Sequence, residues 1–441
     1  MEGTEYLQNI VIDQKKGIPK GIYSVCSYNR YVIEASFRQA MEDESVVLIE
    51  STCNQVNQYG GYTGMNPVDF KRYIFSIAGS MNFPNERIIL GGDHLGPYPF
   101  QNEKAESAMD KARVMVREYM LTGVSKIHLD ASMSLGDDPG GPNSALDPRT
   151  IAERCAELCD MAEKTHGEVG KKNNQLPAPV YVIGTEVPAP GGSDEVEKGL
   201  KITKVSDLKE TVSLTMELFQ KHNLQDAWER VIAVVVQPGV EHGDHTIIEY
   251  DREKAKDLTS SLKEFPHLVF EGHATDYQTA RGLKEMVEDG IAILKAGPSL
   301  TFATREAVFL LNYMEEEIFR GSPHVTLSKF NDTLENAMLK NPKHWQKHYQ
   351  GSEHELQFAR KYSFFDRARY YWMDEKVKNS LKVLIENLGS RDIPLSLISQ
   401  FSPEQYNKIR AGKLQKGPEA LIRDRISEIL KVYSYAVGNR D

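Results

Sequence analysis

Residues 87–97 read Arg87-Ile-Ile-Leu-Gly-Gly-Asp-His-Leu-Gly-Pro97. The stretch begins apolar, continues through two glycines and ends in an acid, an imidazole and a turn. An apolar run bounded by turn residues is typical of a strand covered on both faces, as in a parallel sheet. The stretch therefore predicts a buried strand that delivers Asp93 and His94 to the rim of a sheet.

Seven further apolar runs have the same character and alternate with segments of helical periodicity. They are Gly21–Ser27, Ser45–Ser51, Lys126–Ala131, Val180–Val187, Val231–Gly239, Leu268–Ala274 and Ile291–Pro298. Parallel strands need helical crossovers, so this alternation predicts an α/β fold. A closed (β/α)8 TIM barrel is the simplest arrangement, and a doubly wound open sheet is the alternative. The alternative commonly carries a glycine-rich nucleotide loop, and neither G-x-G-x-x-G nor G-x-x-x-x-G-K-[ST] occurs in the chain.

The remainder of the chain is helical in pattern. From about Thr301 the apolar spacing stays helical to the end, with no cluster of strand-like runs. We therefore expect a barrel over residues 1–304 and a helical C-terminal extension over residues 305–441 that packs on it.

Composition excludes several classes of partner. The net charge of -10 and pI near 5.7 would repel nucleic acid and anionic lipid. The N-terminus lacks the features of a signal peptide and no apolar stretch approaches the roughly 20 residues of a membrane span. Four cysteines without a C-x-x-C pair fit a reducing compartment. We expect a cytoplasmic protein that acts on a small molecule.

Metal-type ligands follow the predicted strands. In a barrel of this type the active site lies at the C-terminal ends of the strands. Histidines follow three of these strands, and they are His94, His242 or His245, and His273. Catalytic zinc commonly takes three histidines, or two histidines and a carboxylate, and leaves a position open. The pattern predicts a metal site there, and His242 and His245 remain alternatives for one ligand.

Carboxylates and polar residues at the same rim are further candidates. Asp93 and Glu186 are candidate proton-transfer groups, whereas His128 lies within a strand and is interpreted as structural. The turn at Lys295, Gly297 and Ser299 precedes a helix and could bind phosphate. The other candidate substrate contacts are Asn54, Gln55, Asp130, Gln237, Glu241 and Gly272. A later segment, Tyr362–Trp372, joins Arg367 and Arg369 to aromatic residues, and an interface is favoured over an anion clamp.

Several motifs together carry a resemblance to a known family. They are Ser24–Ser27, Ile49–Met65, Gly91–Pro97, Lys126–Asp130, Ile183–Pro188, Val236–Glu241, His273–Thr279, Leu294–Pro298, Arg369–Trp372 and Ile393–Gln400. The chain resembles the Z-subunit family of bacterial tagatose-1,6-bisphosphate aldolase over essentially its whole length. The resemblance implies a class II aldolase-like barrel with a helical C-terminal region. Members of the family have been described as stabilising subunits of the aldolase, as tagatose-6-phosphate kinases and as metal-dependent 4-epimerases of ketohexose 6-phosphates.

The resemblance also implies roles for individual residues. Class II aldolases use an Asp-His pair after a strand as acid/base and zinc ligand, which implies Asp93 as acid/base and His94 and His273 as ligands. Aldolase Z subunits usually read Val-Glu-Phe-Asp-His later in the chain, whereas this chain reads Val240-Glu-His-Gly-Asp-His245. Aligning the Asp-His pair points to His245, and an ungapped alignment points to His242.

The chemistry of C4 inversion separates the described activities. The C4 proton of a 2-ketose is not adjacent to the carbonyl, so simple deprotonation cannot invert this centre. Without a dinucleotide motif, breaking and remaking the C3–C4 bond is favoured over transient oxidation, and the missing nucleotide loop argues against a kinase. We expect a metal-dependent epimerase of tagatose 6-phosphate and fructose 6-phosphate. Zinc is the expected ion, with Mn, Co and Ni as alternatives. A non-catalytic or stabilising aldolase subunit is the alternative function, and either a homo-oligomer or an aldolase partner is expected.

Overall fold

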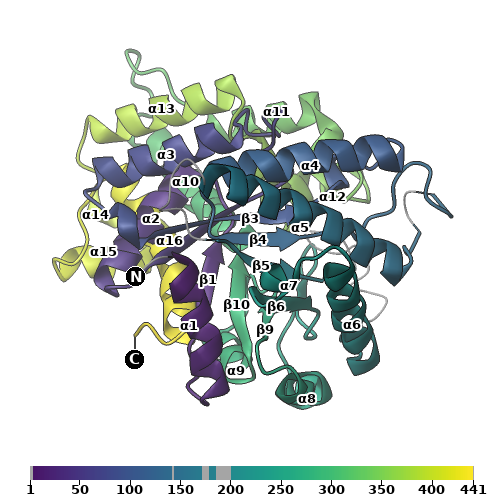
Figure 1. Ribbon diagram of the computed structural model, residues 1–441. Helices are drawn as coiled ribbons and strands as arrows, with labels where there is room; N and C mark the ends of the chain where they lie inside the picture. Colours follow the sequence, from purple (N-terminus) through teal and green to yellow (C-terminus); the bar gives the residue numbers. More distant parts are fainter. Residues whose placement is uncertain (1–2, 142–143, 171–177, 185–199, 441) are drawn as a thin grey trace.

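The computed structural model describes residues 3–141, 144–170, 178–184 and 200–440. Eight parallel strands form a closed barrel, which confirms the predicted (β/α)8 fold (Figure 1). They are β1 (Ile22–Val25), β2 (Val47–Thr52), β3 (Ile88–Leu95), β4 (Lys126–Leu129), β5 (Val180–Ile183), β6 (Val231–Val236), β9 (Val269–Gly272) and β10 (Ile291–Ala296). The order around the barrel is β1-β10-β9-β6-β5-β4-β3-β2. A small antiparallel hairpin, β7 (Glu241–His242) and β8 (Ile247–Ile248), follows β6 and was not expected from the sequence.

Helices surround the barrel, as parallel crossovers require (Figure 1). They are α2 (Arg30–Glu42), α3 (Pro67–Ser80), α4 (Ala105–Leu121), α5 (Pro148–Gly170), α6 (Val205–Lys221), α7 (Gln225–Trp228), α8 (Arg252–Ser261), α9 (Ala280–Glu288) and α10 (Pro298–Ile318). Short 3-10 turns lie at Asn85–Arg87, Tyr98–Phe100, Leu262–Glu264 and Pro342–His344. In the part of the chain that the structure describes, no helix is both long and apolar enough to cross a membrane.

An N-terminal helix, α1 (Gly3–Lys15), covers one end of the barrel. Its buried side chains Leu7, Ile10 and Val11 pack among apolar residues that face the barrel interior. The sequence of this segment is mostly polar, and only four of its residues are buried, which is why a helix was not expected there.

The barrel interior changes from apolar to ionisable along the strands. Near α1 the inward-facing side chains form an apolar layer that includes Ile22, Leu48, Ile89, Val269 and Ile293. Side chains two positions apart on a strand share a face. The next positions on these five strands are Ser24, Glu50, Gly91, Glu271 and Lys295, and the positions after those are Cys26, Thr52, Asp93, His273 and Gly297. The last five all line one pocket, so the alternation that fills the core also builds the site.

Gly91 makes room for the charged layer, the layer of inward-facing side chains that contains Glu50, Glu271 and Lys295. A Cβ atom at this position would lie 2.5 Å from Oε1 of Glu50. Any larger residue would therefore displace the carboxylate. Gly91, in the stretch 87–97, therefore leaves space for the side chain of Glu50 on the neighbouring strand.

The C-terminal region consists of helices that pack on the barrel. They are α11 (Phe330–Lys340), α12 (Glu353–Tyr362), the 3-10 helix η6 (Arg367–Tyr371), α13 (Glu375–Gly389), α14 (Leu395–Phe401), α15 (Pro403–Arg410) and α16 (Pro418–Ala436). The last helix, α16, packs against α2, α9 and α10 and so completes the layer around the barrel. The expected boundary at residue 304 falls inside α10, and the division into two parts stays a prediction.

Candidate active site

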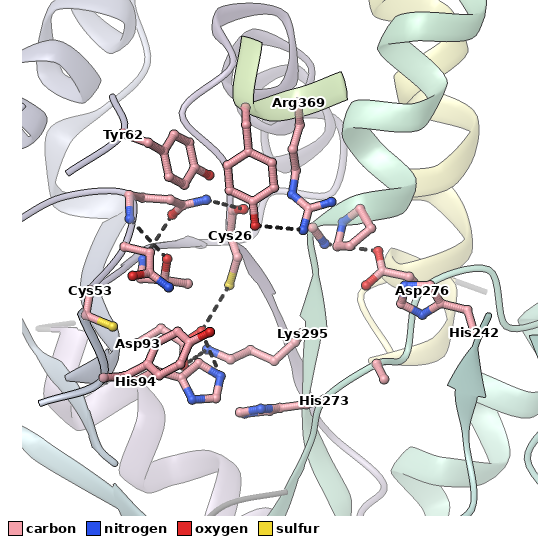
Figure 2. A pocket seen from close by; sticks show the side chains of 18 of the residues that line it. Cys26, Cys53, Tyr62, Asp93, His94, His242, His273, Asp276, Lys295 and Arg369 are labelled. Atoms are coloured by element: carbon pink, nitrogen blue, oxygen red, sulfur yellow. Dashed lines mark hydrogen bonds and ion pairs between the residues drawn. The ribbon is translucent and has the colours of Figure 1, made fainter. Parts of the chain in front are cut away.

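A pocket opens at the C-terminal ends of the strands (Figure 2). Its floor comes from the barrel, and part of its wall comes from η6 in the C-terminal region. It is lined by Cys26, Thr52, Cys53, Asn54, Gln55, Tyr62, Asp93, His94, Tyr98, Glu241, His242, His273, Ala274, Asp276, Lys295, Gly297, Pro298, Arg369 and Tyr370. This is the rim where the sequence predicts a site.

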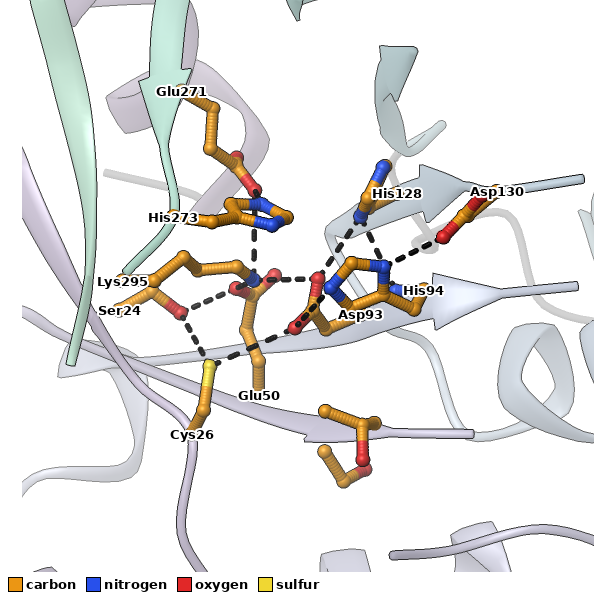
Figure 3. Close-up of polar contacts among 12 residues, drawn as sticks. Ser24, Cys26, Glu50, Asp93, His94, His128, Asp130, Glu271, His273 and Lys295 are labelled. Carbon is orange, nitrogen blue, oxygen red and sulfur yellow. Dashed lines mark hydrogen bonds and ion pairs between the residues drawn. The ribbon is translucent and has the colours of Figure 1, made fainter. Parts of the chain in front are cut away.

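Three imidazoles gather at the floor (Figure 3). The ring centroids of His94 and His128 lie 4.7 Å apart, those of His94 and His273 lie 4.8 Å apart, and those of His128 and His273 lie 5.3 Å apart. One candidate ligand atom from each, together with one from Asp93, lies within 4.8 Å of the others. The predicted residues Asp93, His94 and His273 thus meet, and His128 joins them from β4.

Carboxylates orient two of these rings. Nδ1 of His94 lies 2.7 Å from Oδ2 of Asp130, and Nε2 of His273 lies 3.0 Å from Oε1 of Glu271. In these two rings the nitrogen that faces the carboxylate carries the proton, so the opposite nitrogen presents its lone pair. Carboxylate–histidine pairs of this kind typically support metal ligands. Asp130 therefore acts on His94 and lies outside the pocket lining.

His128 is held by backbone groups as well. Its Nε2 donates to the carbonyl of Gly184 at 2.9 Å, and its Nδ1 accepts the backbone N–H of His94 at 3.2 Å. The same Nδ1 lies 3.0 Å from Oδ1 of Asp93. The ring is thereby fixed against both residues of the Asp-His pair. Both ring nitrogens of His128 are thus engaged by the protein, and its structural role stays a prediction.

Two buried lysines tie the carboxylates together. Nζ of Lys126 lies 2.7 Å from Oε1 of Glu50 and 2.8 Å from Oε2 of Glu271. Nζ of Lys295 lies 2.5 Å from Oε2 of Glu50 and 2.7 Å from Oδ1 of Asp93. Lys295 therefore connects the charged layer to the pocket floor (Figure 3).

The cluster fits a divalent metal in both donor type and charge. Imidazoles and a carboxylate are the ligands that zinc and similar ions take. The described side chains of the cluster include four buried carboxylates and two buried ammonium groups, a formal excess of two negative charges when the imidazoles are neutral. They are Glu50, Asp93, Asp130 and Glu271 against Lys126 and Lys295. Uncompensated buried charge is unfavourable, and a dication would balance it.

The protonation states of Asp93 and His273 suit these roles. Burial opposes the ionised form of Asp93, but His94 and Lys295 outweigh it and hold the pKa of Asp93 well below its usual range. Burial also opposes the charged form of His94, yet Asp93 and Asp130 raise its pKa. Burial lowers the pKa of His273 to about 4. At neutral pH Asp93 is ionised and His273 is a neutral donor.

Backbone strain marks the site. The φ angles of His94 and Ala274 are 48° and 51°, in the left-handed region that residues other than glycine seldom adopt. Both residues line the pocket. Strain of this kind persists where the surrounding structure requires a particular side-chain direction, and it is concentrated at functional sites.

Other predicted residues lie outside the pocket floor. His242 lines the pocket but does not belong to the imidazole cluster, and His245 has a side chain that is 55% exposed and packs against Phe358. Gly272 faces outward, because a Cβ there would meet Ile291 and Met286. Among the pocket-lining residues that the structure describes, Asp130, Gln237, Gly272 and Ser299 do not appear, whereas Asn54, Gln55, Glu241, Lys295 and Gly297 do. Glu186 lies outside the described residues.

The turn before α10 has its donors engaged. The backbone N–H groups of Gly297 and Ser299 donate to Oδ1 of Asp276 at 3.0 and 2.8 Å. The ammonium of Lys295 contacts carboxylates. Phosphate binding by this turn stays a prediction, and it would require these internal bonds to be replaced.

Comparison with known proteins identifies the family. The model of the family described as D-tagatose-1,6-bisphosphate aldolase subunit GatZ/KbaZ-like matches residues 7–438. The chain belongs to this family. The resemblance inferred from the sequence motifs is thereby confirmed.

One solved structure supports the same relationship, and two others match more distantly. This member of the GatZ/KbaZ-like family is similar to the crystal structure of a probable tagatose 6 phosphate kinase from Sinorhizobium meliloti 1021, with 40% identity and a TM-score of 0.85 over 95% of this chain and 100% of that chain. A fructose-bisphosphate aldolase from Campylobacter jejuni gives 16% identity and a TM-score of 0.44, covering 88% of this chain and 92% of that chain. The YdjI aldolase from Escherichia coli K12 gives 12% identity and a TM-score of 0.41, covering 86% and 95%.

Replacing Glu241 by Gln is expected to stabilise the protein at pH 8 and leave it unchanged at pH 4.5. Burial raises the pKa of Glu241 to about 7, so folding imposes a cost on its ionised form that is complete above pH 7 and absent below the unfolded value of about 4.5. We expect a gain on the order of 2 kcal/mol at pH 8, measured by thermal unfolding. The exposed Glu253→Gln variant is the control. An equal change for Glu241→Gln at both pH values would contradict this assignment.

Proposed function

We propose that the chain is a metal-dependent 4-epimerase that interconverts tagatose 6-phosphate and fructose 6-phosphate. The observation that carries the proposal is the gathering of three imidazoles and Asp93 at the floor of a pocket. Residues placed only to stabilise a partner subunit would lie on the surface. These four are buried inside the barrel rim.

The metal-binding residues follow from the donor set. His94 and His273 would hold the cation, with Asp93 beside them, whereas His128 would position His94 and Asp93, since its two ring nitrogens bond Gly184 and the N–H of His94. Zinc is the expected ion, with Mn, Co and Ni as alternatives. When bound, the cation supplies Lewis-acid polarisation of the ketose carbonyl.

Asp93 is the group proposed to move the proton. It is ionised, so it can accept the proton of the C4 hydroxyl. The C3–C4 bond then breaks, its electron pair stays on a three-carbon enediolate, and the other half becomes glyceraldehyde 3-phosphate. The aldehyde turns its other face, C3 attacks it to re-form the bond, and Asp93 returns the proton to the new C4 oxygen. Glu186 remains a second candidate for proton transfer.

Lys295 supports this chemistry from beside Asp93. Its ammonium lies 2.7 Å from Oδ1 of Asp93 and keeps that carboxyl ionised. A fixed positive charge next to the pocket floor also favours negative charge that develops on the substrate during bond cleavage.

The second candidate function is a stabilising subunit of tagatose-1,6-bisphosphate aldolase. The family description, which reads aldolase subunit, favours it. An aldolase carries out the same bond cleavage and then releases both halves, so the proposed site also suits a lyase. The candidates differ in what the chain does alone.

The deciding experiment incubates the purified chain, without a partner protein, with fructose 6-phosphate and a divalent metal. We expect tagatose 6-phosphate to form, and a chelator to stop its formation. Release of triose products would indicate an aldolase. If neither product appears with zinc, manganese, cobalt or nickel, the proposed epimerase is rejected and the stabilising-subunit function is favoured.

Metal content tests the ligand assignment separately from activity. His94→Ala and His273→Ala should each lower the metal bound per chain by at least tenfold, because each variant removes one nitrogen ligand. Elemental analysis after dialysis provides the measurement. His245→Ala is the matched control, since its side chain is 55% exposed, and it should retain wild-type metal. Unchanged metal in both variants would exclude this site.

A further inference from the structure

A segment of the C-terminal region forms one wall of the pocket, and three hydrogen bonds to loops at the strand ends hold it. The hydroxyl of Tyr28 donates to the carbonyl of Arg369 at 2.7 Å, and the hydroxyl of Tyr277 donates to the carbonyl of Phe364 at 2.8 Å. The N–H of Phe364 donates to the carbonyl of Asp244 at 3.0 Å. Residues 364–370 are thus fixed above the barrel by the loops after β1, β6 and β9.

Arg369 brings a buried positive charge to this wall. Its side chain lines the pocket, and the residue is only 9% exposed. The guanidinium donates to the backbone carbonyls of Phe365 and Asp366, the latter at 3.1 Å, and to the Tyr370 hydroxyl at 3.4 Å. All of these acceptors are neutral. Among the described residues, no carboxylate lies within 4.0 Å of this guanidinium.

The acid nearest to Arg369 in the sequence is Asp366, and its carboxylate makes its direct contacts with other residues. The carboxylate of Asp366 accepts from the hydroxyl of Thr301 at 2.5 Å and from Nε of Arg305 at 3.3 Å. Burying a cation whose direct hydrogen-bond acceptors are all neutral is costly. An arginine kept in this state at a pocket wall is therefore suited to an anion brought by a ligand.

Neighbouring groups experience the same positive potential. Burial opposes ionisation of Tyr370, but Arg369 and Arg367 outweigh it and lower the pKa of its phenol. Burial, together with Arg367 and Arg369, lowers the pKa of His348 to about 4. The wall as a whole favours negative charge.

His242 gives a second, independent indication of a ligand. It lines the pocket and is 1% exposed, yet neither ring nitrogen has a hydrogen-bond partner. Buried polar groups without partners are rare in folded proteins. Figure 2 shows His242 beside Asp276 and apart from His94, so the metal cluster does not explain it.

We propose that Arg369, with Tyr370 and His242, binds the phosphoryl group of the sugar phosphate. The planar guanidinium suits phosphate oxygens, which it can contact in pairs. With its phosphoryl group at this wall, the sugar extends from Arg369 toward Asp93 and His94 at the floor. This inference rests on the proposed function for the identity of the ligand. The C-terminal region then supplies substrate recognition that the barrel lacks.

Titration calorimetry of the full chain tests the subsite with fructose 6-phosphate, fructose and inorganic phosphate. Arg369→Met should weaken fructose 6-phosphate binding at least tenfold, abolish phosphate binding and leave fructose binding unchanged. The control is Arg391→Met, an exposed arginine of the same region outside the pocket, which should bind all three as the wild type does. A second variant, His242→Asn, should weaken fructose 6-phosphate but not fructose.

Two calorimetric results for Arg369→Met would overturn the subsite. One is fructose 6-phosphate affinity within twofold of wild type in Arg369→Met. The other is an equal loss for fructose and fructose 6-phosphate. If Arg369→Met does not fold, Arg369→Lys replaces it, because it keeps the charge but loses the planar fork, and wild-type affinity in that variant is equally contrary. If the wild type binds fructose 6-phosphate but does not turn it over, the epimerase is rejected and the subsite is kept. If Arg369→Met turns it over as the wild type does, the subsite is rejected and the epimerase is kept.

Discussion

Replacing Asp93 by Asn is expected to lower kcat/KM for fructose 6-phosphate by about 10²- to 10⁴-fold, the usual contribution of a positioned proton-transfer group. The amide has nearly the same shape but cannot accept the C4 hydroxyl proton. Asp93 also contacts Lys295 at 2.7 Å and His128 at 3.0 Å, so the variant leaves that ammonium with one carboxylate partner fewer. Substrate binding, measured by calorimetry, should persist, because the phosphoryl group is held elsewhere.

The control for this variant is Asp289→Asn. Asp289 pairs with Arg252 at 2.8 Å near the start of β10, at the end of the barrel away from the pocket. This variant should keep wild-type turnover. If Asp93→Asn retains more than a tenth of wild-type kcat/KM, Asp93 is not the acid/base group.

Replacing Lys126 by Met is expected to lower the free energy of unfolding by about 3–5 kcal/mol, as breaking a buried ion pair from one side does. Lys126 is 0% exposed and bridges Glu50 and Glu271. Its loss leaves Glu50 and Glu271 in the barrel with Lys295 as the one remaining cation that contacts them among the described residues. Urea denaturation monitored by circular dichroism measures the change.

A double variant separates charge from packing. Adding Glu271→Gln to Lys126→Met removes one of the two buried carboxylates that Lys126 had paired and should recover part of the loss. The exposed Lys382→Met variant should change stability by less than about 0.5 kcal/mol. A loss below 1 kcal/mol in Lys126→Met would show that the charged layer does not depend on this bridge.

The fold was predictable because each strand carries its own signal. The eight apolar runs and the helical spacing between them define a parallel barrel, and the glycines and turn residues define its rim. The helix α1 was not predicted, since its apolar face is short and gains stability only from the barrel end that it covers.

The site was predictable in part for a related reason. Asp93, His94 and His273 follow strands directly, and chain order places them at one rim. His128 could have been recognised as well, because the two-residue alternation of Lys126, His128 and Asp130 puts all three on one face.

Arg369 could not have been placed in the same way. It reaches the pocket through a bond with Tyr28, which lies 341 positions away in the sequence. Its neighbour Tyr370 enters the pocket for the same reason. Contacts between such distant segments depend on how the C-terminal helices pack, and no local pattern encodes that packing. The distinction between His242 and His245 likewise depends on the hairpin β7–β8, which buries one ring and exposes the other.

The central claim is that this chain alone inverts C4 by breaking and re-forming the C3–C4 bond. The most direct test supplies fructose 6-phosphate that carries deuterium at C4 to the purified, metal-loaded chain, with no nicotinamide cofactor added. Carbon–carbon cleavage never removes that hydrogen, so the account predicts tagatose 6-phosphate with deuterium fully retained at C4 and no product after chelation. Absence of tagatose 6-phosphate, or product whose C4 hydrogen comes from solvent, would contradict it.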